Sequence, residues 1–283
     1  MSKNRSRWLF LTAAFGSEEY DDAAHRLVSQ AEELKLFDKL HIAGLQDLMQ
    51  ICPRELSVLP QENLTSSCKF GYYFWKPIII SAAIEGFWGE YEGVVYIDAG
   101  SEILPGLISQ IFFAYHMRSA SKKGINVFAV KTPEISYTKK EVLQFFNLGE
   151  EFLHHNQFQA GTIFVAGPIG REICFLWREI IRLNPALISP QTNLPQFSDF
   201  IAHRHDQSVL SCLLKKVGIS KSMWMPGGIL KSPLQQVRNL HRGLWWSRNI
   251  SRQSSILPLL YLVLSRTTLS PQLTAFLKPY KKF

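Results

Sequence analysis

The sequence has few cysteines, no long apolar run and no internal repeat. Its four cysteines, Cys52, Cys68, Cys174 and Cys212, are widely scattered, and neither a CxxC pair nor a Cys/His metal spacing occurs. Disulfide frameworks and zinc sites use closer, recurring spacings, so we expect reduced thiols in a cytoplasmic protein. No apolar run approaches the roughly 20 residues that span a bilayer, and we therefore expect no transmembrane helix.

Acidic residues are missing from the end of the chain, because no Asp or Glu occurs from Lys215 to Phe283. The whole chain has a formal net charge of +8 and a pI near 9.3. This charge favours an anionic partner: a nucleotide, a phosphorylated lipid, an acidic membrane surface or a nucleic acid. The stretch HRGLWWSRNISRQ mixes cations with aromatic rings, which is typical of a segment on an anionic membrane surface. A C-terminal helix packed on the domain explains the same tail.

Strand and helix patterns alternate over the first 220 residues. Short apolar runs that predict buried strands are WLFLTAAF, KLHIAG, GVVYID, INVFAV and FQAGTIFVAG. Helix patterns lie between them, which predicts an α/β fold with a doubly wound, mostly parallel sheet flanked by helices. The opening MSKNRSRWLFLTAAFG has the charges of a signal peptide, but an acidic helical segment follows at once, so we interpret it as the first strand. We expect a domain over residues 1–223 and a basic, helical C-terminal extension over 224–283.

Three polar clusters lie at the ends of these elements: GYYFWKP, YIDAGSE and HRHDQS. Asp98 follows a buried strand, and ligands of open α/β sheets bind just beyond the carboxyl ends of the strands. Lys76 precedes an apolar helix, and Asp206 stands at the start of another. Each cluster alone is also explained by a turn, a surface lysine or a helix cap.

Together these clusters resemble a family. GYYFWKPIII, VVYIDAGSEI, NQFQAGTIFV and HRHDQSVLSCLL occur here in the order found in bacterial GT-A-type glycosyltransferases of capsular or surface polysaccharide synthesis. The likeness spans roughly residues 7 to 220 and includes FLTAAFGSEEY. It implies a GT-A-like domain that transfers a sugar from a nucleotide sugar to a saccharide or lipid-linked acceptor, in the cytoplasm or on the inner face of the membrane.

The resemblance also implies roles for individual residues. Asp206 would be the carboxylate nearest the donor sugar, with Gln207 as its hydrogen-bonding neighbour; whether Asp206 also acts as a general base stays open. The residues implied in donor binding are Thr12, Ala13, Phe15, Lys76, Asp98, Ala99, Gly100, Gln159, Ala160, Gly161 and Arg204. Tyr137 and Lys139 would border the acceptor.

The sequence departs from the family at the metal motif. GT-A enzymes usually have Asp-x-Asp at this strand end, whereas here Gly100 stands at the second position. Two alternatives remain. Either Asp98 binds Mn²⁺ or Mg²⁺ together with Glu102, His203 or His205, or Lys76 and Arg204 meet the phosphates directly.

Gly100 also motivates a different class of function, a degenerate member that binds a nucleotide sugar or a partner protein without turnover. Nucleic-acid binding through the tail is the least favoured class, because no recognised module is present and the site-like residues lie outside the tail.

Overall fold

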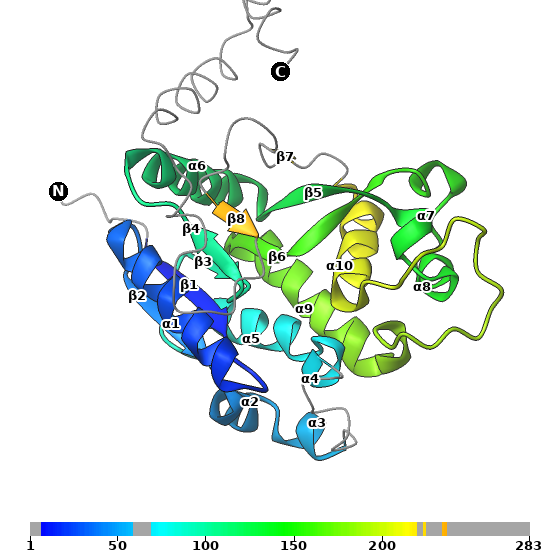
Figure 1. Ribbon diagram of the computed structural model, residues 1–283, viewed down its shortest axis with the longest axis horizontal. Coiled ribbons are helices and arrows are strands. Elements are labelled where there is room, and N and C mark those ends of the chain that lie inside the picture. The colour runs from blue at the N-terminus through cyan, green and yellow to red at the C-terminus, as the bar shows by residue number, and fades with distance from the viewer. Residues whose placement is uncertain (1–6, 59–68, 220–222, 225–233, 237–283) are drawn as a thin grey trace, which may run out of the picture.

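A computed structural model describes residues 7–58, 69–219, 223–224 and 234–236 (Figure 1). The strands are β1 Trp8–Ala13, β2 Lys39–Ala43, β3 Gly93–Ile97, β4 Ser101–Ile103, β5 Ile125–Pro133, β6 Asn156–Ala166, β7 Met223–Trp224 and β8 Leu234–Gln236. The longer helices are α1 Glu18–Glu33, α5 Trp75–Ile84, α6 Leu107–Lys123, α9 Gly167–Leu183 and α10 His205–Lys216. The shorter ones are α2 Leu45–Ile51, α3 Pro53–Val58, α4 Lys69–Tyr72, α7 Glu134–Tyr137 and α8 Lys140–Phe145, with 3-10 turns η2 Glu150–Phe152 and η3 Pro185–Leu187.

Six strands form the central sheet in the order β2-β1-β3-β6-β5-β7. The pairs β1–β2, β1–β3 and β5–β7 are parallel, whereas β6 runs antiparallel to both β3 and β5. The expected mostly parallel sheet flanked by helices is therefore confirmed, with β6 as the reversed strand. A second, two-stranded sheet pairs β4 with β8.

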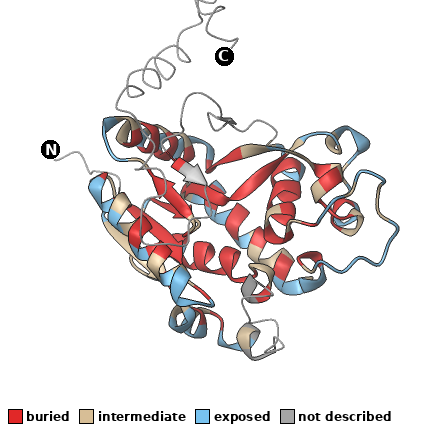
Figure 2. Ribbon diagram, in the orientation of Figure 1, coloured by how far each residue is buried: buried red, intermediate tan, exposed pale blue. Residues whose placement is uncertain are grey.

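The two faces of the sheet bury alternate residues of the same strands. Leu9 and Leu11 of β1 join a core with the apolar sides of α5, α9 and α10. Trp8 and Phe10 face the other way and pack with α1 and α6. The strands are thus buried on both sides between helices, as Figure 2 shows, and their nearly continuous apolar sequences follow from this.

Several predictions fall on parts that the structure does not describe. The C-terminal extension lies outside the described residues except for Trp224 and residues 234–236, so the division at residue 223 stays a prediction. Cys52, Cys174 and Cys212 are buried free thiols, and Cys68 lies outside the described part. Within the described ranges, no helix is both long and apolar enough to cross a bilayer.

Candidate functional site

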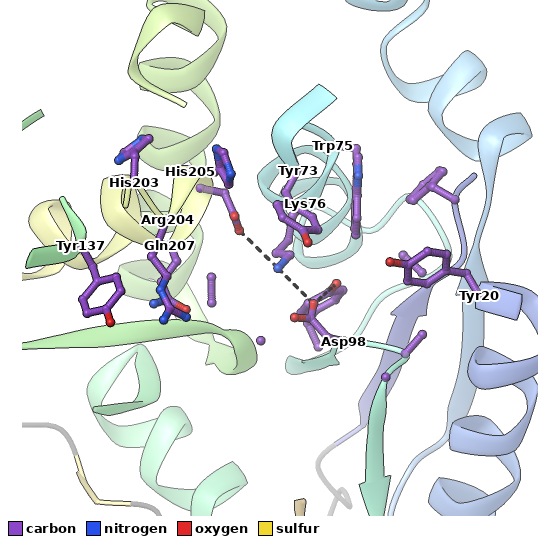
Figure 3. Close-up of a pocket in the computed structure, with 18 of the residues that line it drawn as sticks. Tyr20, Tyr73, Trp75, Lys76, Asp98, Tyr137, His203, Arg204, His205 and Gln207 are labelled. Atoms are coloured by element: carbon purple, nitrogen blue, oxygen red, sulfur yellow. Dashed lines mark hydrogen bonds and ion pairs between the residues drawn. The ribbon is translucent and has the colours of Figure 1, made fainter. Parts of the chain in front are cut away.

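Three charged side chains from distant parts of the chain meet at one end of the sheet. Lys76 lies in the first turn of α5, Asp98 directly follows β3, and Asp206 is the second residue of α10. Lys76 Nζ is 3.0 Å from Asp98 Oδ1 and 3.2 Å from Asp206 Oδ2. Figure 3 shows the Lys76 side chain reaching toward Asp98 from the helix above it. The three clusters GYYFWKP, YIDAGSE and HRHDQS therefore build one site.

The backbone that leads into two of these helices is unusual. Tyr72, Tyr73 and His205 have φ angles of 55°, 64° and 47°, in the left-handed region that side chains other than glycine rarely adopt. The ring of Tyr72 stacks on that of His205, with centroids 5.1 Å apart. His205 Nδ1 also lies 2.8 Å from the carbonyl oxygen of Ile188. The ring stack joins the segment before α5 to the start of α10, and the contact with Ile188 ties that start to the chain after α9. Backbone strain of this kind concentrates at functional sites.

The charged residues line a cavity of about 550 Å³. Its lining residues are Ala13, Phe15, Tyr20, Tyr73, Trp75, Lys76, Tyr96, Asp98, Ala99, Gly100, Tyr137, Ala160, Gly161, Ala202, His203, Arg204, His205, Asp206 and Gln207. Tyr20 and Trp75 lie on one side in Figure 3, Tyr137, Arg204 and Gln207 lie on the other, and Lys76 and Asp98 lie between them. A cleft of this size with a few converging polar groups is typical of a small-molecule site.

Burial and charge set the protonation of the central residues. Burial raises the pKa of Asp206 to about 6, Lys76 opposes this rise, and the negative charge of Asp98 adds to it. Burial alone would lower the pKa of Lys76, but attraction to Asp206 and then to Asp98 outweighs it, and the pKa ends above its ordinary value. Lys76 is thus a permanent cation, whereas Asp206 takes up a proton near pH 6.

Aromatic rings enclose the Lys76 ammonium. Its Nζ lies 4.9 Å from the centroid of the Tyr73 ring, 5.5 Å from that of Tyr96 and 5.9 Å from that of Trp75. The Tyr96 hydroxyl donates a 2.7 Å hydrogen bond to Asp98 Oδ1. Ring faces attract a cation, so this enclosure fixes the ammonium between the two carboxylates. Asp98 has a side chain that is 43% exposed, against 4% for Asp206, so its carboxylate is the more open of the two.

Most of the residues implied in donor binding do line the cavity, but Thr12 and Gln159 do not. Both are buried in strands beside it. Of the two acceptor candidates, Tyr137 lines the cavity and Lys139 does not. Lys139 is buried, and its Nζ donates hydrogen bonds to the carbonyl oxygens of Ala186, Ser189 and Gln191, at 2.6, 2.9 and 3.0 Å. Lys139 therefore holds the chain after α9 in place and does not face the cavity.

The expected metal ligands are not brought together. Glu102 is buried in β4, outside the cavity lining, and acts electrostatically on Arg26. His203 lines the cavity, but its Nε2 lies 2.7 Å from the carbonyl oxygen of Leu187 and its Nδ1 lies 3.5 Å from the Lys139 amide nitrogen. In the part of the chain that is described, no three His, Cys, Asp or Glu side chains are grouped so that they could hold a metal ion.

These residues do not fit a divalent-cation site by themselves, because the Lys76 ammonium already lies between the two carboxylates. The expectation of Mn²⁺ or Mg²⁺ stays a prediction for experiment.

Five lining residues were not predicted as site residues: Tyr20, Tyr73, Trp75, Tyr96 and Ala202. Tyr96 had a usable signal, because side chains two apart on a strand share a face, and Tyr96 stands two before Asp98. Tyr73 and Trp75 flank Lys76 within the quoted motif. Tyr20 ends the quoted stretch FLTAAFGSEEY and lies in the first turn of α1, but its position on that helix gives no sign that it faces the site.

No family model and no curated protein matches the chain. Among the solved structures that resemble it are three glycosyltransferases. One is described as involved in glycosylation of the major capsid of PBCV-1, with 14% identity over 62% of this chain and 66% of the other and a TM-score of 0.32. Mouse xyloside xylosyltransferase 1 has 10% identity over 77% of this chain and 85% of its own, with a TM-score of 0.40. The WbbM bifunctional glycosyltransferase has 9% identity over 80% of this chain and 40% of its own, also with a TM-score of 0.40.

The chain spans less than two thirds of the length of the first and the third of these proteins. All three TM-scores are below 0.5, a likeness too weak to indicate an activity.

Proposed function

We propose that the chain is a glycosyltransferase that uses a nucleotide-sugar donor. The observation that carries this proposal is the meeting of Lys76, Asp98 and Asp206 in one cavity at the carboxyl ends of β1 and β3. Glycosyl transfer needs a pocket that holds a base, a ribose and a sugar, together with a charge near the anomeric carbon. The order of the four sequence motifs supports the same proposal.

The two ends of the cavity suit different parts of such a donor. Phe15 and Trp75 have ring centroids 4.5 Å apart, and with Tyr20 they form an aromatic end in which a nucleotide base would stack. The carboxylates at the centre accept hydrogen bonds, which sugar and ribose hydroxyls donate. Asp206 would lie nearest the sugar and stabilise the positive charge that develops at the anomeric carbon as the diphosphate leaves.

The acceptor is proposed to be a saccharide or a lipid-linked saccharide of a surface polysaccharide. Tyr137 and Arg204 line the cavity on the side away from the aromatic end, and the guanidinium carbon of Arg204 lies 4.5 Å from the Tyr137 ring centroid. Attachment to an anionic membrane surface through the basic tail is a further proposal, which rests on sequence alone. If membrane binding is unchanged after the tail is deleted, that part is wrong.

A second candidate is a degenerate protein that binds a nucleotide sugar without turnover. Gly100 in place of an aspartate, and the ammonium between the two carboxylates, favour it. It predicts binding of nucleotide sugars with no release of nucleotide, whether Mn²⁺ is added or chelated.

The deciding experiment is a screen of UDP-, GDP- and related nucleotide sugars for nucleotide release, alone and with saccharide acceptors, with Mn²⁺ or with EDTA. We expect release from one class of donor and loss of release in the Asp98→Ala and Asp206→Ala variants. The same screen run by thermal shift reports donor binding, because a ligand that binds only the folded chain raises its melting temperature. Absence of both release and binding for every donor would contradict the proposal.

The rate of nucleotide release from the donor is expected to depend on pH through the protonation of Asp206. Its pKa of about 6 lies above the ordinary 3.8 because the group is buried, so its carboxylate gains a proton as the pH falls through about 6. Turnover should therefore be full well above pH 6 and fall below it. A profile that stays flat down to pH 4.5 would show that the charge of Asp206 is not used.

A further inference from the structure

A buried ion pair lies behind the wall of the cavity. The Glu134 carboxylate is fully buried, and Lys215 Nζ donates to its Oε1, as does the Ser211 hydroxyl. The Thr138 hydroxyl donates to the other oxygen, Oε2. Because an ionised carboxylate only accepts hydrogen bonds, every group around Glu134 must point a hydrogen toward it. The ion pair thereby gives a direction to the hydrogen bonds that start from it.

The next group in this chain of hydrogen bonds is the Gln157 amide, which is fully buried in β6. Its Nε2 donates to Glu134 Oε2 at 3.2 Å and to the Tyr137 carbonyl oxygen at 3.2 Å, and neither of these can donate. It also contacts the hydroxyls of Thr138 at 2.8 Å and Ser208 at 3.2 Å, whose own hydrogens point to Glu134 and Tyr137. All four neighbouring atoms therefore offer an acceptor and none offers a hydrogen, so the NH₂ of Gln157, with its two hydrogens, must face them.

The oxygen of Gln157 consequently faces the opposite way, toward the cavity wall. Gln207 Nε2 donates to Gln157 Oε1 at 2.9 Å. Since a carbonyl oxygen only accepts, the flipped orientation of Gln207 would set two oxygens against each other. The buried charge of Glu134 thus fixes the orientation of the Gln207 amide through Gln157. Gln207 lines the cavity, and with its Nε2 donating to Gln157 it can offer its Oε1 as an acceptor there.

We propose that Gln157 is a positioning residue that turns Gln207 Oε1 into the cavity, where it accepts a hydrogen bond from a hydroxyl group of the bound sugar. This rests on the proposed function. The adjoining carboxylates of Asp206 and Asp98 also accept hydrogen bonds. These acceptors suit a ligand face rich in hydroxyls, whereas the cations Lys76 and Arg204, which also line the cavity, suit a phosphate.

The first test needs no ligand. Side-chain amide protons of Gln207, assigned by their loss in Gln207→Leu, are expected to exchange with solvent at least about tenfold more slowly than those of the exposed Gln144. In Gln157→Met, which keeps the length of the side chain, the Gln207 protons should exchange as fast as those of Gln144. Equal exchange rates for Gln207 and Gln144 in the wild type would overturn the proposal, and this comparison holds even if Gln157→Met does not fold.

The second test separates positioning from general damage. Binding of UDP, GDP, UDP-glucose and GDP-mannose is measured by calorimetry on the wild type, on Gln157→Met and on the control Gln144→Leu. We expect Gln157→Met to raise the Kd of the nucleotide sugar that binds the wild type by about 3- to 10-fold. The Kd of UDP or GDP alone should stay within about twofold of its wild-type value.

Equal weakening of nucleotide and nucleotide sugar would show a merely structural role and overturn the proposal. If no probe binds the wild type, the proposed function fails together with the hydroxyl contact. The exchange measurement then still decides the orientation of Gln207, so the two failures are distinguishable.

Discussion

The Asp206→Asn variant is expected to release nucleotide from the donor about 10²- to 10³-fold more slowly than the wild type, which is the usual effect of removing one preorganised charge partner from a reacting centre. Asparagine keeps the shape of the side chain and loses its charge. Lys76 retains Asp98 as an ion-pair partner at 3.0 Å, so the fold and the cavity should persist. Single-turnover measurement at pH 8 separates the chemical step from donor binding.

A matched control is Asp199→Asn, because Asp199 is exposed in the segment before α10 and does not line the cavity. It should turn over at the wild-type rate. The role given to Asp206 is wrong if both variants retain wild-type turnover, and it is also wrong if Asp206→Asn loses only donor affinity with the rate of the bound complex unchanged.

The variants Glu134→Gln and Lys215→Met are each expected to lower the free energy of unfolding by about 3–5 kcal/mol. The side chains of Lys215 and Glu134 are 2% and 0% exposed, and removing one partner leaves the other buried without its counter-charge. For a chain of this size the melting temperature should fall by roughly 10 °C. Urea unfolding of the two variants and of the double variant measures the loss and the coupling between the residues.

The control for this pair is Arg182→Met. Arg182 forms an ion pair with Glu179 three residues earlier on α9, at 2.7 Å, with side chains 42% and 22% exposed. Water screens this pair, so its loss should cost no more than about 1 kcal/mol. Equal costs for Arg182→Met and Glu134→Gln would contradict the account of the buried network.

The layered fold was predictable because its strands are buried on both sides. WLFLTA and GVVYI read as unbroken apolar runs, and these became β1 and β3. The direction of β6 was not predictable, since the same apolar sequence serves a parallel or an antiparallel strand and only its partners decide between them. Lys76 was expected to precede an apolar helix, but α5 begins at Trp75 and has Lys76 within its first turn.

The centre of the site was predictable from motifs at element ends, because strand ends and helix starts gather at one rim of such a sheet. The errors of detail come from side-chain direction. Glu102 stands only four residues after Asp98, but β4 carries it away from the cavity to interact with Arg26. Lys139 was expected to border the acceptor, yet its Nζ donates to three backbone carbonyl oxygens.

The buried network behind the cavity could not be predicted at all. Gln157 immediately precedes the FQAG stretch and reads as the polar start of a strand. Its partners Glu134, Thr138 and Ser208 come from other elements, and only the fold brings them within hydrogen-bond distance. Burial of so many polar groups is explained only when each partner is known.

The most direct test of the central claim is a crystal structure of the chain with the nucleotide sugar that the screen selects. We predict the base between Phe15 and Tyr20, and the sugar within about 3 Å of Asp206 and Gln207. A second cavity of about 600 Å³, lined by Arg54, Arg178 and Arg182, offers an alternative place for an anionic ligand. A donor bound there, with the cavity around Lys76 empty, would contradict the account.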